Sequence, residues 1–192
     1  MKLYLIRHGQ TDWNLGRKIQ GSCDIELNNT GVIQAKELGH KLLANNYKFS
    51  KIYSSPQKRA LQTAETLSKV TSIEYESIEG LEEINLGVWE GLSWDEVQEQ
   101  YPCEYEVWST KRRYMKPPEG ETYEEMLQRA LTAIHKIIQE NCDNVLIVSH
   151  SAVIAAIQCY LTNTPFEDLL NFITGNAEIT EIEASAFEQR TI

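Results

Sequence analysis

The sequence predicts an α/β fold, a three-layer sandwich in which helices cover both faces of a mainly parallel central sheet. Short apolar runs alternate along the chain with longer segments whose apolar residues recur at helical spacing. Strands that alternate with helices are typical of βαβ units, which bring parallel strands side by side. The chain has 192 residues, enough for one full core, so we expect a single domain over residues 1–192.

The first half of the chain contains three predicted strands and two predicted helices. Apolar and β-branched residues predict the strands, at Lys2–Ile6, Lys51–Ser54 and Ser72–Ile78. A helix is predicted over Asn29–Asn46, because Asn-Thr-Gly is typical of a helix start and apolar residues follow at helical spacing. A second helix is predicted to hold Pro56 in its first turn, where proline is tolerated. Its inner face consists of Ala60, Leu61, Ala64 and Leu67.

The second half of the chain completes the alternation. Ser93 followed by Glu96 forms a capping-box pattern, which predicts a short helix over Ser93–Tyr101. Apolar residues along one side predict a long helix over Glu121–Glu140. The remaining predicted elements are the strand Val145–Ser149, the apolar helix Ala152–Leu161 and an edge strand at Ile179–Ala184.

Composition and charge argue against several classes of protein. The net charge of −10 disfavours non-specific binding to nucleic acid or to an anionic membrane surface. No apolar stretch is long enough to cross a bilayer, and the first apolar run is too short for a signal peptide. The cysteines lie far apart and lack metal-ligand spacing, so we expect reduced thiols in a cytoplasmic protein. They are Cys23, Cys103, Cys142 and Cys159.

Three predicted strands end next to residues that suit phosphate chemistry. The first ends at Arg7-His8, the second is followed by Arg59, and the strand at residues 145–149 is followed by His150. Because parallel strands place their carboxyl ends at one edge of the sheet, where ligands bind, we expect these side chains to meet. A histidine can attack phosphorus, and an arginine can hold phosphoryl oxygens in its planar fork. Free backbone N–H groups at Ser151 and Ala152, where the next helix begins, would also bind an anion.

Six motifs resemble those of the histidine phosphatase superfamily, in the branch of small phosphatases and cofactor-dependent phosphoglycerate mutases. They are Leu5-Ile-Arg-His-Gly-Gln-Thr-Asp-Trp-Asn14, Ile19-Gln-Gly21, Leu27-x-x-x-Gly-x-x-Gln-Ala35, Tyr53-Ser-Ser-Pro-x-x-Arg-Ala-x-x-Thr-Ala64, Glu83-Ile-Asn-Leu-Gly-Val-Trp-Glu-Gly91 and Val148-Ser-His-Ser151. Each motif alone is weakly specific, but together they extend over nearly the whole chain. Chain length and the run at residues 87–91 resemble the α-ribazole phosphatase type and broad-specificity phosphatases.

The resemblance implies a role for each matching residue. His8 matches the nucleophile that forms a phosphohistidine. The groups that surround the phosphoryl oxygens are matched by Arg7, Arg59 and His150. A backbone carbonyl bonded to the other ring N–H of His8 is expected to fix the attacking tautomer. Further substrate contacts are implied for Asn14, for the backbone of Ser151 and, on the substrate side, for Ser22.

Glu83 matches the proton donor of the family, and its neighbour Glu82 is the alternative. In an extended segment the two side chains face opposite ways, so only one can point into the site, and the motif favours Glu83. The implied mechanism needs no metal and no cofactor. Its partner is a small phosphate ester, and the sequence carries no signal for an oligomeric state.

The sequence is compatible with three functions. A metal-independent phosphomonoesterase, with α-ribazole phosphate as one candidate substrate, is favoured because the segment at about 92–120 is short for the lid of a mutase. We expect that variable segment to shape the substrate pocket. A phosphoglycerate mutase is the alternative, because Lys111-Arg112-Arg113 resembles the basic pair that holds the substrate in mutases. A catalytically silent binding module is disfavoured because every chemical position is filled. The tryptophans expected to pack rather than stack on a ligand are Trp89, Trp94 and Trp108.

Overall fold

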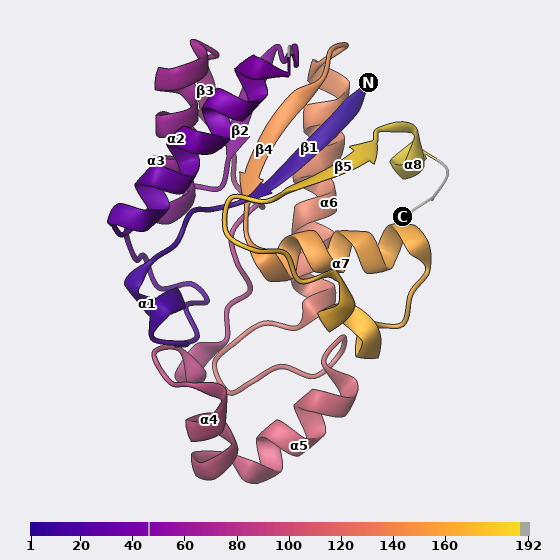
Figure 1. The fold of residues 1–192 in the computed structure, drawn as a ribbon. Helices are drawn as coiled ribbons and strands as arrows, with labels where there is room; N and C mark the ends of the chain where they lie inside the picture. The colour runs from indigo at the N-terminus through magenta and orange to yellow at the C-terminus, as the bar shows by residue number, and fades with distance from the viewer. Residues whose placement is uncertain (46, 189–192) are drawn as a thin grey trace.

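The computed structural model describes residues 1–45 and 47–188. Its described part contains a five-stranded sheet with the strand order β3-β2-β4-β1-β5 (Figure 1). The strands are β1 (Lys2–Arg7), β2 (Lys51–Ser54), β3 (Tyr75–Ser77), β4 (Val145–Ser149) and β5 (Ile179–Glu183). Neighbouring strands from β3 to β1 pair in parallel, whereas β5 pairs antiparallel with β1. The predicted α/β class with a mainly parallel sheet is confirmed.

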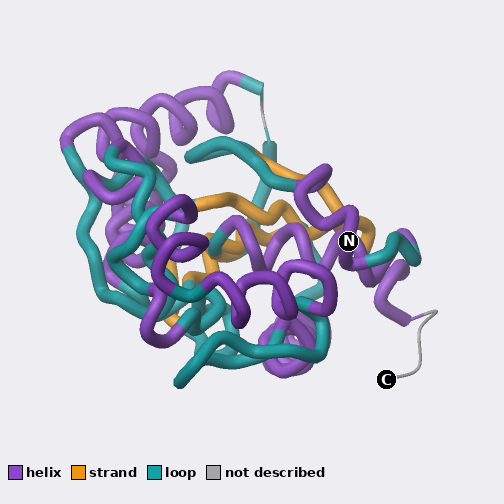
Figure 2. The backbone as a smooth tube through the Cα atoms, turned by 90° about the horizontal axis from the view of Figure 1, so that it is seen from below, coloured by secondary structure: helices purple, strands orange, loops and turns teal. Residues whose placement is uncertain are grey.

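Helices cover both faces of this sheet, because alternate strand residues point to opposite sides. The four long helices are α2 (Asn29–Ala44), α3 (Lys58–Thr71), α6 (Tyr123–Glu140) and α7 (Ser151–Thr162). Tyr4 and Ile6 of β1 lie in a buried cluster with α2 and α3. Leu3 and Leu5 lie in the larger buried cluster, with α6 and α7. Figure 2 shows the strands between these two sets of helices.

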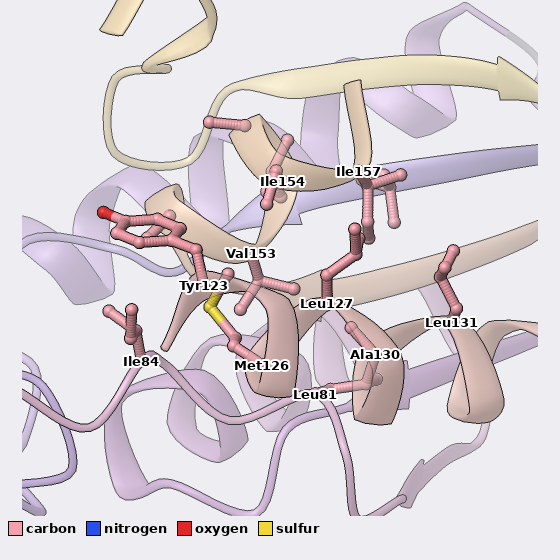
Figure 3. Close-up of a cluster of buried hydrophobic side chains, with 14 of the residues drawn as sticks. Leu81, Ile84, Tyr123, Met126, Leu127, Ala130, Leu131, Val153, Ile154 and Ile157 are labelled. Carbon is pink, nitrogen blue, oxygen red and sulfur yellow. The ribbon is translucent and has the colours of Figure 1, made fainter. Parts of the chain in front are cut away.

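The larger cluster also holds a loop segment in place. Figure 3 shows side chains of α6, of α7 and of the loop around residue 83 gathered in one apolar group. Leu81 and Ile84 belong to that loop and are 0% and 1% exposed. The two residues between them, Glu82 and Glu83, are therefore flanked on both sides by buried anchors.

Several predicted boundaries shift in the structure, and two of the shifts have a clear backbone cause. The predicted helix end at Asn46 lies outside the described residues. Helix α3 begins at Lys58 rather than near Pro56, because Gln57 still has an extended backbone with ψ of 137°. Strand β3 is shorter than the predicted run from Ser72, because Ser72 ends α3 in the left-handed conformation with φ of 60°.

The segment 92–120 contains one more helix than predicted. Helix α4 (Trp94–Gln100) is the predicted one, and α5 (Pro102–Lys111) follows after Tyr101. Proline suits the first turn of a helix, so Pro102 starts α5 instead of only ending α4. The other unpredicted elements are α1 (Asp12–Leu15), η1 (Gly87–Trp89), η2 (Phe166–Phe172) and α8 (Ser185–Glu188). The arrowheads of β1 and β4 point toward the end of the molecule where α4 and α5 lie (Figure 1).

Two further findings concern the whole described chain. None of its described helices combines the length and apolar character needed to cross a membrane. All four cysteines are free thiols.

Candidate active site

The parallel pairing of β1 with β4 brings two histidines together. The register places Arg7 opposite Ser149, and the His8 N–H donates to the carbonyl of Ser149 at 3.0 Å. The ring centroids of His8 and His150 are 5.2 Å apart. Strand β2 pairs with the other side of β4, and the residue after it, Ser55, contacts the His150 ring. The strand ends therefore meet at one edge of the sheet.

The backbone fixes the tautomer of His8. Its Nδ1 lies 2.7 Å from the carbonyl oxygen of Gly9, which can only accept, so Nδ1 carries the proton. Nε2 is left with a lone pair. The side chain is almost completely buried, and burial together with the charge of Arg59 holds the pKa of His8 well below its ordinary value. A neutral imidazole with one defined basic nitrogen is suited to nucleophilic attack.

Two arginines, the buried Arg59 and the half-buried Arg7, face the same region. Arg59 is fully buried, and its guanidinium donates to the carbonyls of Cys23 at 2.7 Å and of Gly21 at 2.8 Å. Arg7 donates to the carbonyl of Thr174. Burial lowers the pKa of both guanidinium groups, yet arginine stays charged in proteins. These neutral acceptors leave two positive charges that an anion can compensate.

The ring of His150 is oriented by one hydrogen bond. Its Nε2 lies 2.8 Å from the hydroxyl oxygen of Ser55. Burial and the charge of Arg59 hold the pKa of His150 well below its ordinary value. Four buried polar atoms around this point have no hydrogen-bond partner among the described residues: Arg7 Nε, Arg59 Nε, His150 Nδ1 and Ser151 Oγ. A buried polar atom without a partner costs roughly 1–3 kcal/mol, so this group is suited to an oxyanion ligand.

Glu83, and not Glu82, points into the site. The Glu83 carboxylate accepts from the N–H groups of Ile84 at 3.1 Å and of Ala152 at 3.4 Å. Burial raises the pKa of Glu83, and the charge of Arg59 partly opposes this rise. The Glu82 carboxylate instead accepts from its own loop and from Arg129, on the other side of the segment. The alternation expected for neighbouring residues thus separates the two acids.

A cavity of about 400 Å³ opens beside these groups. Asn14 lines it, with its Oδ1 occupied by Asn176 at 3.3 Å and by the Thr11 N–H at 3.1 Å, so the NH₂ group can donate to a ligand. Ser151 lines it as well. Ser22 does not, because its hydroxyl and its N–H both donate to the carboxylate of Glu90. Ser22 instead borders a second depression, which Glu83 also lines, and its expected place on the substrate side stays a prediction.

The family model of the histidine phosphatase superfamily, branch 1, matches residues 3–191. The chain belongs to the histidine phosphatase superfamily. The predicted family and its enzyme class, a phosphatase, are confirmed.

Relatives and solved structures agree with this family. The chain is 34% identical over 181 residues to a putative phosphoserine phosphatase 2 of Hydrogenobacter thermophilus, covering 94% of this chain and 88% of the relative. It is 34% identical to 6-phosphofructo-2-kinase/fructose-2,6-bisphosphatase 4 of Rattus norvegicus, covering 87% of this chain but only 34% of that longer protein.

Two solved structures are similar over most of their length. The phosphoserine phosphatase of Entamoeba histolytica, in complex with 3-phosphoglyceric acid, has a TM-score of 0.81 at 33% identity and covers 94% of this chain and 89% of that chain. The alpha-ribazole phosphatase of Shigella flexneri has a TM-score of 0.83 at 26% identity and covers 95% of this chain and 90% of that chain.

The outer part of the cavity in this histidine phosphatase is aromatic. The ring-bearing residues that line it are Trp94, Tyr105, Trp108 and Tyr123. Trp89 does not line it and is completely buried under the rings of Trp94 and Trp108. The expectation that the tryptophans pack therefore fits Trp89, whereas Trp94 and Trp108 pack together and also face the cavity.

The basic triplet of this histidine phosphatase divides between two surfaces. Arg112 lines the cavity, with its guanidinium 5.0 Å from the centre of the Trp108 ring. Arg113 pairs instead with Glu124 at 2.7 Å, and Lys111 lies with it in a separate surface depression. One member of the triplet reaches the site.

Sequence reasoning missed three residues that organise the site. Ser55 and Gln57 lie within the motif at residues 53–64. Their place in that motif indicated that they lie near the site, but a serine and a glutamine are not by themselves typical of phosphate chemistry. Gln57 accepts from the backbone N–H of Glu83 at 2.8 Å and contacts Arg59 at 3.2 Å. Arg129 lies outside every motif, and its contacts with the Glu83 loop follow only from the folded chain.

Proposed function

We propose that this chain is a metal-independent phosphomonoesterase that transfers the phosphoryl group of a small phosphate ester first to His8 and then to water. One observation carries the proposal: a neutral histidine with a free Nε2 lies beside buried, unpartnered donors of Arg7, Arg59 and His150. Fixed donors around a transferring phosphoryl group supply most of the catalysis in this type of reaction.

In the first half-reaction, Nε2 of His8 attacks phosphorus and the bond to the ester oxygen breaks. Arg7, Arg59 and His150 bind the non-bridging oxygens, and the N–H of Ser151 at the start of α7 adds a further donor, whereas the N–H of Ala152 donates to Glu83. Glu83 gives its proton to the leaving alkoxide. Burial favours the protonated form of Glu83, which this step requires.

In the second half-reaction, the Glu83 carboxylate takes a proton from water, and the water oxygen attacks the phosphohistidine. The phosphorus–nitrogen bond breaks, inorganic phosphate forms, and His8 returns to its neutral state. Because side chains supply every charge in this scheme, we expect activity to persist in excess chelator.

The outer cavity favours an ester that carries an aromatic or a second anionic group. Trp94, Tyr105 and Trp108 offer ring faces, and Arg112 offers a positive charge. Helices α4 and α5 supply most of these side chains, which supports the proposal that the segment at about 92–120 shapes the substrate pocket. α-Ribazole phosphate has an aromatic base, and phosphoserine has a carboxylate, so both belong among the first substrates to test.

Hydrolysis of the phosphohistidine is favoured over return of the phosphoryl group to another hydroxyl of the substrate. Leu170 and Ile173 line the cavity and are 63% and 46% exposed, so the mouth of the site is in contact with solvent. A site that admits water hydrolyses its phosphohistidine after each turnover. Arg112 is the observation that keeps a phosphoglycerate mutase as the second candidate.

The test is a screen of phosphate esters with purified protein, including α-ribazole phosphate, phosphoserine and 3-phosphoglycerate, with and without 2,3-bisphosphoglycerate. We expect release of inorganic phosphate, no stimulation by the bisphosphate and no activity in His8→Ala. Interconversion of 3- and 2-phosphoglycerate at about ten per second or faster, the range of a dedicated enzyme, with little phosphate released, would establish the mutase instead.

A further inference from the structure

The loop that carries Glu83 has no helix or strand to fix it. Residues 80–86 lie between β3 and η1 without regular secondary structure. Leu81 and Ile84 anchor the loop in the apolar cluster of Figure 3, but apolar contacts are non-directional. A proton donor must be held to within a fraction of an ångström to act on a leaving group. Directional contacts with the loop backbone are therefore required.

Arg129 of α6 supplies these contacts. Its Nη1 donates to the carbonyls of Gly80 at 3.0 Å and of Glu82 at 2.7 Å. Its Nη2 donates to the carbonyl of Glu83 at 3.1 Å. One rigid, planar guanidinium thus binds three carbonyl groups of the loop, including that of the proton donor itself.

The guanidinium is held in turn by Glu121. The Glu121 carboxylate accepts from Nη2 of Arg129 at 2.6 Å and from its Nε at 3.2 Å. The same carboxylate accepts from the N–H of Asn85 at 2.8 Å, and the N–H of Glu121 donates to the carbonyl of Asn85 at 2.9 Å. Both ends of the loop are therefore bound to one ion pair, between Glu121 just before α6 and Arg129 within it.

We propose that Arg129 is the positioning residue for Glu83, and this proposal rests on the function proposed above. The backbone of Glu83 is held from two sides, because its N–H donates to Gln57 at 2.8 Å and its carbonyl accepts from Arg129. Arg129 is absent from the cavity lining, so it acts on the reaction through Glu83 and not by binding the phosphoryl group.

The first experiment compares two leaving groups in Arg129→Gln. Phosphoenzyme formation is measured in single turnovers with an alkyl phosphate, whose alkoxide needs a proton, and with p-nitrophenyl phosphate, whose leaving group hardly does. We expect a loss of about 10- to 100-fold for the alkyl phosphate and less than about threefold for p-nitrophenyl phosphate. Lys136→Gln removes a charge from the exposed side of the same helix and is the matched control.

A double-mutant cycle separates positioning from a general structural role. In a Glu83→Gln background, Arg129→Gln should cause less than about a twofold further loss, because the group it positions is already gone. Equal losses for both substrates, or a further tenfold loss in the Glu83→Gln background, would overturn the proposal. If Arg129→Gln does not fold, as judged by circular dichroism, Arg129→Lys is tested in the same cycle. Turnover in folded His8→Ala would refute the phosphohistidine mechanism separately, whatever the Arg129 variants show.

Discussion

The hydroxyl of Ser55 lies 2.8 Å from Nε2 of His150 and is the hydrogen-bond partner of that buried ring. A neutral imidazole has one donor and one acceptor. When the Ser55 hydroxyl donates to Nε2, the proton resides on Nδ1, the nitrogen that has no hydrogen-bond partner within residues 1–45 and 47–188. A phosphoryl oxygen can only accept, so this tautomer is the one that a neutral His150 needs in order to bind it.

Replacement of Ser55 by alanine should therefore weaken phosphoryl binding without removing a catalytic group. We expect kcat/KM to fall by about 5- to 30-fold, the effect of one or two kcal/mol in hydrogen bonding. Steady-state kinetics and the affinity for vanadate measure this change. Ser54→Ala, which removes the neighbouring buried hydroxyl bonded to the Ser55 carbonyl, is the control. An unchanged vanadate affinity in Ser55→Ala would show that the tautomer is set in another way.

Glu90 should matter for both stability and anion binding. Its carboxylate accepts from the N–H groups of Ser22 at 2.7 Å and Leu86 at 3.0 Å, and from the thiol of Cys23 at 3.2 Å. These contacts fix the loop around Ser22, and that loop carries the carbonyls of Gly21 and Cys23, which accept from the Arg59 guanidinium.

We expect Glu90→Ala to lower the free energy of unfolding by about 1–3 kcal/mol, because several donors lose their acceptor. The affinity for vanadate should fall in parallel, since the Arg59 guanidinium is less well placed. Urea denaturation and competitive inhibition measure the two effects, with exposed Glu99→Ala as the control. If Glu90→Ala is destabilised but binds vanadate with full affinity, the loop does not position the Arg59 guanidinium.

Stability should increase with pH across the histidine titration range. The pKa values of His8 and His150 are lowered in the folded state, so the unfolded chain binds more protons below its own pKa of about 6.5. Their contribution is fully present above about pH 6.5 and is lost as the pH falls toward the folded values. Glu83 acts in the opposite sense, because its raised pKa stabilises the fold at low pH and this contribution is lost as the pH rises through the folded value.

The histidine contribution can be isolated in a Glu83→Gln background. There, the free energy of unfolding should rise between about pH 5 and pH 7, and His8→Asn should reduce the slope. His40→Asn, at an exposed position on α2, should not. A slope that is the same with and without His8 would contradict the assignment of a neutral, buried nucleophile.

Much of this site could be predicted from the sequence because its residues follow strand ends. Arg7, His8 and His150 are placed by β1 and β4, so the order of strands brings them together. Alternation along an extended segment implied that only one of Glu82 and Glu83 points into the site, and the resemblance to the family motif favoured Glu83. The roles assigned to these residues by resemblance stay predictions until they are measured.

Other features depend on contacts that no local pattern encodes. Arg129 binds backbone carbonyls of an irregular loop. Every residue has such a carbonyl, so the residue types of the loop do not indicate which of them accept. Ser22 lies in a motif-bearing region, but the carboxylate of Glu90 takes its hydroxyl. Helix α5 was missed because Pro102 resembles a helix end as much as a helix start.

Arg112 should affect some substrates and not others. It is the member of the basic triplet that lines the cavity. We expect Arg112→Met to raise KM about tenfold for esters with a second anionic group, such as phosphoserine, and to leave p-nitrophenyl phosphate nearly unchanged. Lys111→Met is the matched control, because Lys111 lies in the separate depression. Equal effects of the two substitutions on KM would show that Arg112 does not contribute to substrate recognition.

The most direct test of the central claim is a rapid-quench measurement of phosphoryl transfer to His8. The enzyme is mixed with a substrate labelled on its phosphoryl group and quenched within milliseconds, and the labelled site is mapped. We expect a protein-bound label that is acid-labile and base-stable, resides on His8 and is absent from folded His8→Ala. A label on another residue, or full turnover by His8→Ala, would contradict it.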